Sequence, residues 1–311
     1  MAKKKYWNIF KIVFKLAFTG LLVFLVFKKI NFHEVRSVFL KAGPLYIIAA
    51  GVTFFASQVI SSWRLLGFLG CIGLHPGFGF NFRLYLLGMF YNVFLPGGIG
   101  GDGYKIYLLR KKFGLPTKQI LTSLLLDRVS GLWALAFLAT MLTFALPDFP
   151  FKKVCPYLFG VGSIAYYFIY QWKFKSFLPG FLPGHGKAIL VQGLQLSSIF
   201  LLIASQHFIG NVMPYLFCFL LSSLATILPV SIGGLGIREY VIVQLAPIFG
   251  MDKSLAVFST LSFYLISTLI ALSGAWFALK SKEFERMPDE STASATEDDT
   301  NKPIHLHRQT P

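Results

Sequence analysis

The sequence predicts an all-α polytopic membrane protein with about six crossings and two glycine-rich re-entrant hairpins related as an inverted repeat. Three observations favour this class. Of the 311 residues, 55% are hydrophobic and only 14% are charged, whereas soluble domains usually carry about 25% charged residues. Several apolar runs approach the roughly 20 residues that cross a bilayer. A glycine-rich motif also occurs twice, once in each half of the chain.

The apolar runs give the candidate membrane segments. They are Leu16–Phe27, Leu45–Ile60, Ser130–Leu146, Ala188–Ser205, Tyr215–Val230 and Leu255–Leu279. A basic segment precedes the first run, but no small-residue cleavage site follows it, so we expect a retained helix and not a signal peptide. The three cysteines and six histidines show no ligand or disulfide spacing. We therefore expect no metal site and no cofactor.

Charge separates the chain into two parts. The net charge is +16, and seven of the 13 acidic residues lie in the last 29 residues. This segment, 283–311, lacks the apolar content to fold, so we expect a disordered acidic tail after a membrane domain at 1–282. The membrane domain holds 26 basic and six acidic residues. Because Lys and Arg flank most spans, anionic lipid is the expected partner and nucleic acid is not.

The glycine-rich motif breaks the apolar pattern near 92–112 and again near 225–247. The 12 residues from Pro96 to Tyr107 match those from Pro229 to Tyr240 at six positions, and Lys105 aligns with Arg238. Glycine and proline interrupt helices, and irregular backbone at membrane depth must face protein or a water-filled cavity. Corresponding breaks in two halves indicate a transporter's substrate site.

The number of crossings between the motifs decides their relative orientation. Three crossings are expected, at Gln119–Leu146, Val154–Tyr170 and Lys187–Phe208. An odd number makes two re-entrant hairpins enter from opposite faces, whereas kinked full crossings would make the repeat parallel. A cytoplasmic N-terminus places more Lys and Arg inside than outside, in agreement with the positive-inside rule. We therefore expect a multi-pass protein of the cell (cytoplasmic or inner) membrane with both termini in the cytoplasm.

Each motif ends where a new helix is expected to begin. Asp102 is predicted to cap a helix over 103–112, and a second half-helix is predicted from near Gly234 to about Pro247. Helix N-termini attract phosphate, so Lys105 and Arg238 would complete a cradle for a phosphorylated headgroup. In the alternative interpretation, the glycines only permit close helix packing and the charged side chains cap helices or snorkel.

Asp127 and Arg128 lie inside the apolar segment "ILTSLLLDRVSGLWAL". A charge at that depth costs about 3 kcal/mol or more unless it is paired or hydrated. Successive residues of a helix point about 100° apart, so the two side chains should meet different partners. Asp127 could hold Lys105 or Arg238, and Arg128 could reach a helix cap, Glu239 or a lipid phosphate; a purely structural ion pair is the alternative.

The candidate substrate-binding residues come from these three motifs. They are Gly100, Gly101, Asp102, Lys105, Asp127, Arg128, Gly233, Gly234, Arg238 and Glu239. No nucleophile–histidine–acid arrangement stands out, so no catalytic residue is predicted.

The same motifs resemble the flippase-like membrane domain family, the transmembrane region of lysylphosphatidylglycerol synthase (multiple peptide resistance factor). "LPGGIGGDGYKIYLL", "LLLDRVSGLWAL" and "LPVSIGGLGIREY" carry the resemblance in this order, up to about Lys282. The family's GGD-x-x-R pattern falls on Gly100 to Lys105, with Lys in place of Arg. Its DR pair falls on Asp127 and Arg128, and its GLG-x-RE pattern on 234–239.

The resemblance implies a domain that moves a phosphate-bearing lipid, such as an aminoacylated phospholipid, between leaflets. The full synthase adds a soluble aminoacyltransferase domain, for which the segment after Lys282 is too short and polar. We therefore expect no enzymatic activity. Anionic phospholipid or a polyprenyl-phosphate lipid is the expected ligand, and a lipid-synthesis enzyme a further partner. A membrane-embedded transferase or assembly factor for a lipid-linked precursor and a small-anion transporter are the alternatives.

Overall fold

The computed structural model describes residues 43–94, 100–146, 149–226 and 237–279. Every regular element in these ranges is a helix. The helices are α3 (Pro44–Gly70), α4 (Phe78–Phe94), α5 (Gly100–Phe113), α6 (Thr117–Thr143), α7 (Val154–Lys173), η1 (Lys175–Phe177), α8 (Leu178–Ala204), α9 (Met213–Ala225), α10 (Ile237–Leu245) and α11 (Lys253–Leu279).

Four of the described helical segments are long and apolar enough to cross a bilayer. They are α3, α6, the continuous run of η1 and α8, and α11. A helix of 27 residues is about 40 Å long at 1.5 Å per residue, more than the roughly 30 Å of hydrocarbon. The all-α polytopic class is thus confirmed. The crossing predicted at Leu16–Phe27 and the tail predicted at 283–311 lie outside the described residues.

One helix exposes an apolar outer face. On α7, Tyr157, Leu158 and Trp172 are largely exposed. Since a helix whose apolar side chains face outward is stable when lipid surrounds it, this face is expected to contact acyl chains.

One predicted membrane segment is shorter than expected. The apolar run Tyr215–Val230 yields α9, which has only 13 residues and ends at Ala225. At about 20 Å such a helix does not cross a bilayer. Near its end the run includes Ser222, Ser223 and Thr226, whose hydroxyls bond to carbonyls one turn earlier. Such bonds compete with the regular helix pattern.

The short helices α4 and α5 form an antiparallel pair, which we call the first hairpin. The Gly101 N–H donates to Asn92 Oδ1 at 2.8 Å, and the Phe80 and Phe113 rings lie 6.0 Å apart at the other end. The two helices have 17 and 14 residues, or about 25 and 21 Å. Neither is long enough to cross a bilayer alone.

The helices α9 and α10 form a similar pair, the second hairpin. Arg238 lies 5.0 Å from the Phe219 ring centroid. At the opposite end, Phe217 and Phe249 are 5.6 Å apart, and the Asp252 N–H donates to the Tyr215 hydroxyl at 2.8 Å. As residue numbers rise on one helix they fall on the other, so this pair is also antiparallel.

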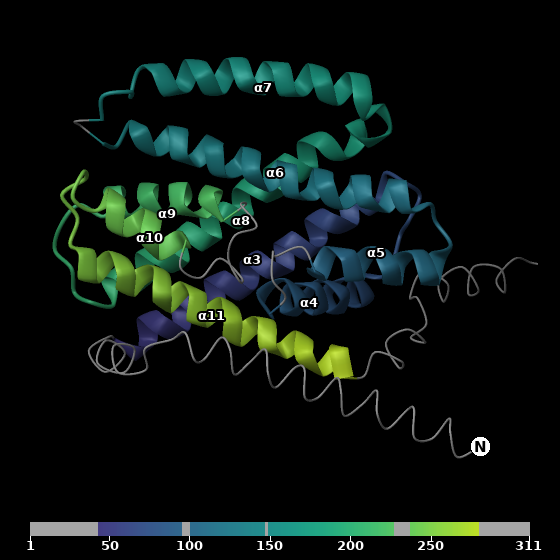
Figure 1. The fold of residues 1–311 in the computed structure, drawn as a ribbon, viewed down its shortest axis with the longest axis horizontal. Helices are drawn as coiled ribbons and strands as arrows, with labels where there is room; N and C mark the ends of the chain where they lie inside the picture. The colour runs from purple at the N-terminus through teal and green to yellow at the C-terminus, as the bar shows by residue number, and fades with distance from the viewer. Residues whose placement is uncertain (1–42, 95–99, 147–148, 227–236, 280–311) are drawn as a thin grey trace, which may run out of the picture.

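The order of long helix, hairpin, long helix occurs twice, as α3–α6 and as α8–α11. The long helices α3 and α8 run antiparallel against each other. The Gly43 N–H donates to the Ser205 carbonyl at 3.2 Å, and the Ser198 hydroxyl donates to the Ala50 carbonyl at 2.9 Å. Figure 1 shows the first hairpin at one end of the molecule and the second hairpin at the other.

Candidate functional site

A polar pocket lies where the second hairpin approaches α6 and α8. Its volume is about 290 Å³. It is lined by Arg128, Gly131, Leu132 and Leu135 of α6, Gln192 and Gln195 of α8, Ser223 and Thr226 at the end of α9, and Arg238 of α10. We call it the two-arginine pocket, because the two charged side chains among its described lining residues are both arginines.

Arg128 links the first hairpin to this pocket. It lies near the middle of α6, and its side chain is 45% exposed. Its Nε donates to the carboxylate of Asp102 in the first turn of α5. The same carboxylate lies 3.6 Å from Lys105 Nζ. One acid at the start of α5 therefore holds two cations.

Arg238 approaches the pocket from the second hairpin. Its guanidinium carbon lies 5.0 Å from the Phe219 ring centroid and 5.2 Å from that of Phe263. Guanidinium groups are attracted to aromatic faces at this distance. The aromatic faces hold the cation beside the neutral polar groups of Ser223 and Thr226, so Arg128 and Arg238 border one space from different hairpins.

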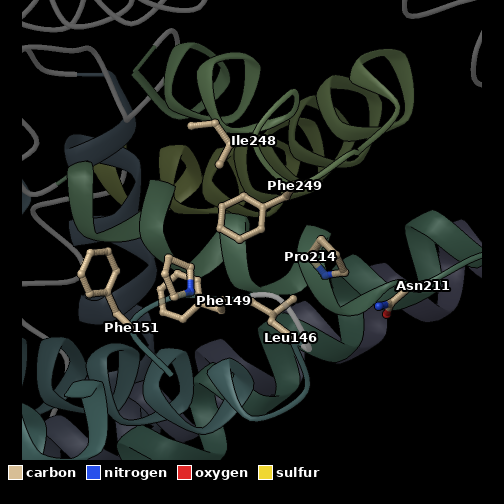
Figure 2. A pocket seen from close by; sticks show the side chains of 8 residues that line it. Leu146, Phe149, Phe151, Asn211, Pro214, Ile248 and Phe249 are labelled. Carbon is tan, nitrogen blue, oxygen red and sulfur yellow. The ribbon is translucent and has the colours of Figure 1, made fainter. Parts of the chain in front are cut away.

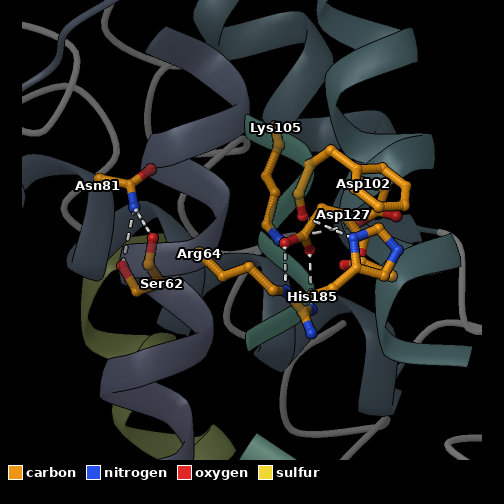
Figure 3. A network of polar contacts seen from close by, with 9 residues as sticks. Ser62, Arg64, Asn81, Asp102, Lys105, Asp127 and His185 are labelled. Atoms are coloured by element: carbon orange, nitrogen blue, oxygen red, sulfur yellow. Dashed lines mark hydrogen bonds and ion pairs between the residues drawn. The ribbon is translucent and has the colours of Figure 1, made fainter. Parts of the chain in front are cut away.

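A second ion pair is buried between α3 and α6. Arg64 Nε and Nη2 donate to the two carboxylate oxygens of Asp127 at 2.7 and 3.2 Å. Both side chains are less than 10% exposed, and this two-point geometry is the strong form of an arginine–carboxylate contact. Figure 3 shows this pair in the same polar network as Asp102 and Lys105.

The partner of Asp127 differs from the sequence expectation. Lys105 and Arg238 are the predicted partners, whereas the carboxylate binds Arg64. The apolar run predicted for this helix ended at Ile60, so Arg64 was not among the expected partners. The helix continues to Gly70, so Arg64 is inside it. The apolar residues that follow Arg64, "LLGFLG", are the signal that could have placed it within the membrane helix.

Lys105 also differs from expectation, because it is directed into the first hairpin. Its side chain is only 6% exposed, and its Nζ lies 4.5 Å from the Tyr85 ring centroid. A Cβ on Gly88 would lie 3.3 Å from that Nζ. Lys105 is not among the residues that line the pocket with Arg238; the cation from the first half that does so is Arg128.

The glycine motifs are only partly described. α5 begins at Gly100, so Asp102 belongs to the first turn of the helix and the prediction that it is the N-cap is wrong. Its carboxylate binds Arg128 and Lys105. Gly101 is buried against α4: a Cβ there would lie 2.6 Å from the Gly88 carbonyl carbon. For Gly101, the geometry favours the packing interpretation.

Three other candidate residues cannot be placed in the same way. Gly233 and Gly234 lie outside the described residues. Glu239 belongs to α10, but its side chain is also outside the described set.

A second, apolar pocket of about 470 Å³ lies between the connection from α6 to α7, the start of α9 and the segment that follows α10 (Figure 2). Phenylalanines 149, 151 and 249 line it, together with Leu146, Ile248, two prolines and Asn211. No charged side chain is among its described lining residues.

The family of the chain follows from comparison with known sequences. The family described as the lysylphosphatidylglycerol synthase TM region matches residues 12–172, just over half of the chain. The chain belongs to this family. The residues that match the family include the first hairpin, Asp127 and Arg128, and the match ends within α7. A comparison with curated proteins finds no significant match.

Membership and the four long apolar helices identify a multi-pass membrane protein. Because the family is the membrane domain of a lipid-modifying synthase, a lipid-related role accords with it.

Proposed function

We propose that this protein is a lipid translocase that moves a phosphate-bearing lipid between leaflets, and that the two-arginine pocket holds the phosphate. One observation carries this proposal: Arg128 and Arg238 line the same pocket although they come from different halves of the chain. Arginine binds phosphate through two parallel N–H donors, and two arginines offer complementary sides of one phosphate.

The depth of the pocket supports a role within the membrane. Arg128 is close to the midpoint of α6, which runs from Thr117 to Thr143, and Gln192 is close to the midpoint of α8. Charged side chains near the middle of spanning helices are costly and mark substrate or ion pathways. A pocket at this level can be offered to either leaflet.

The arrangement of helices supports alternating access. Two hairpins of short helices occupy corresponding places in two series of four helices, and α3 runs antiparallel to α8. An antiparallel pair of corresponding helices is what an inverted repeat requires. In transporters with inverted repeats, the substrate site lies between the repeats near the bilayer midplane. The proposal assigns this role to the two-arginine pocket, because α10 of the second hairpin supplies Arg238 and Asp102 of the first hairpin binds Arg128.

The proposal is tested by transfer of a tail-labelled phosphatidylglycerol between leaflets of proteoliposomes. Arg128→Gln and Arg238→Gln should each lower the initial rate by roughly tenfold to a hundredfold, because a charge-assisted hydrogen bond contributes about 1.5–3 kcal/mol. Lys118→Gln is the matched control, since Lys118 is an exposed cation at the start of the same α6. It should transfer lipid at the wild-type rate.

Three results would contradict the proposal. Both arginine variants could transfer lipid normally while remaining folded. The wild-type protein could carry inorganic phosphate and no lipid, which would favour a small-anion transporter. It could also bind phospholipid without any transfer, which would favour a transferase or assembly factor.

A further inference from the structure

We infer that the two-arginine pocket selects a phosphodiester whose headgroup is neutral and hydroxyl-bearing, and that it discriminates against headgroups that carry an ammonium, such as aminoacylated ones. The inference rests on the proposed function, because it specifies the lipid that the same pocket binds. It follows from the charges around the pocket, the groups that line it and its size.

The first argument is the charge balance of the polar centre. Cations outnumber acids among the side chains of the three motifs and their partners. The cations are Arg64, Lys105, Arg128 and Arg238, and the acids are Asp102, Asp127 and Glu239. With Glu239 counted among the acids, four cations face three acids, and the net charge of these side chains is still positive. In a medium of low dielectric constant, a net positive centre favours an anion and opposes a further cation.

The second argument is that the described carboxylates near the pocket are engaged. Asp127 is bound at two points by Arg64, and Asp102 lies against both Arg128 and Lys105. An ammonium that took either described carboxylate would have to break an existing ion pair, and breaking the buried Arg64–Asp127 pair costs about 3–5 kcal/mol.

The third argument is the neutral polar lining. The Ser223 hydroxyl donates to the Phe219 carbonyl at 2.8 Å, and the Thr226 hydroxyl donates to the Ser223 carbonyl at 2.7 Å. Their oxygens keep lone pairs that accept hydrogen bonds. Gln192, about nine-tenths buried, and Gln195 add amides that both donate and accept. This set of groups matches the hydroxyls of a glycerol or a sugar.

The fourth argument is size. The volume of about 290 Å³ is at the lower end of the roughly 300–1,000 Å³ that small-ligand pockets have. Glycerol phosphate is a small headgroup of about ten non-hydrogen atoms, so it suits a pocket of this size. An aminoacyl group such as lysyl would approximately double that number. The pocket therefore suits the headgroup before aminoacylation better than the headgroup after it.

The test compares lipids on the purified full-length chain by native mass spectrometry, with thermal stabilisation in detergent as a second measure. The panel holds phosphatidylglycerol, phosphatidic acid, lysyl-phosphatidylglycerol, phosphatidylethanolamine and a polyprenyl-phosphate hexose. Phosphatidylglycerol should bind at least roughly tenfold more tightly than its lysyl form, the equivalent of one charge-assisted contact. The comparison of phosphatidylglycerol with the hexose lipid shows whether the hydroxyl-bearing headgroup that the pocket prefers is a glycerol or a sugar.

Gln195→Glu is the decisive variant, because it adds a carboxylate with almost no change in shape. It should weaken phosphatidylglycerol binding and improve lysyl-phosphatidylglycerol binding, so that the preference falls by roughly tenfold or more. The exposed Gln119→Glu on the same helix as Arg128 is the matched control and should leave the preference unchanged.

The inference is overturned if the wild-type protein binds the lysyl form as tightly as phosphatidylglycerol, or if Gln195→Glu leaves the ratio unchanged in a folded protein. Either result would leave the proposed function intact as long as Arg128→Gln and Arg238→Gln still impair transfer. Loss of all phospholipid binding would instead remove the proposed function itself.

Discussion

Replacing Gly101 by alanine is expected to separate the two helices of the first hairpin. A Cβ at this position would lie 2.6 Å from the Gly88 carbonyl carbon and 2.8 Å from Asn92 Oδ1, closer than real Cβ contacts. Backbone cannot rotate away as a side chain can, so α5 must move from α4. Overpacking of this kind costs about 1–3 kcal/mol. Loss of the Gly101–Asn92 hydrogen bond adds roughly 0.5–1.5 kcal/mol, for a total of about 1.5–4.5 kcal/mol.

Gly103→Ala provides the matched control two residues away. Gly103 is exposed in the same helix, and a Cβ there would have no neighbour within 4 Å. Since alanine is favoured over glycine in helices by about 0.5–1 kcal/mol, this variant should be stabilised. The melting temperatures of both variants in one detergent should therefore shift in opposite directions. Equal shifts, or a wild-type melting temperature for Gly101→Ala, would refute the described packing of the first hairpin.

Three further predictions concern stability and use the same melting assay. Asp127→Ala should destabilise the protein by about 3–5 kcal/mol because it leaves the buried charge of Arg64 without its carboxylate. The double variant Asp127→Ala with Arg64→Met should recover most of this loss. Additive losses from the two substitutions would contradict the pairing. Gly274→Ala should be destabilising, since its Cβ would lie 2.7 Å from a carbonyl carbon of α4. Gly162→Ala is the control and should not be destabilising, because a Cβ there would have no neighbour within 4 Å. Similar losses of stability in the two variants would argue against the contact between Gly274 and α4. Gly114→Ala should cost about 1–2 kcal/mol because Gly114 has φ +69°, and an unchanged melting temperature would contradict that backbone conformation.

The sequence predicted the membrane helices well because their signal is local. Long apolar runs locate the central parts of α3, α6, α8 and α11, and these helices extend beyond the runs by up to 13 residues at an end. The extensions of α6 and α3 add "TKQILTSLLLDRV" before Ser130 and "SSWRLLGFLG" after Ile60. Both contain polar and basic residues that lower local hydropathy but are good or neutral helix formers.

The partners of the charged residues could not be predicted in the same way. Asp127 binds Arg64, which is 63 positions away, and such a contact depends on how α3 packs against α6. The sequence did indicate that Asp127 and Arg128 need different partners, because they point in different directions on one helix. It also paired Lys105 with Arg238 by alignment, yet Lys105 turns into the first hairpin and Arg128 lines the pocket. Internal alignment gives corresponding positions, and it does not give side-chain direction.

The central claim is that Arg128 and Arg238 hold one lipid phosphate between them. The most direct measurement is a cryo-electron microscopy map of the full-length protein in nanodiscs that contain phosphatidylglycerol. We predict a phosphate within hydrogen-bond distance of both guanidinium groups, with the headgroup against Gln192 and Thr226. A map in which this pocket contains no lipid while phosphatidylglycerol occupies another site, or in which the two arginines face separate spaces, would contradict the account.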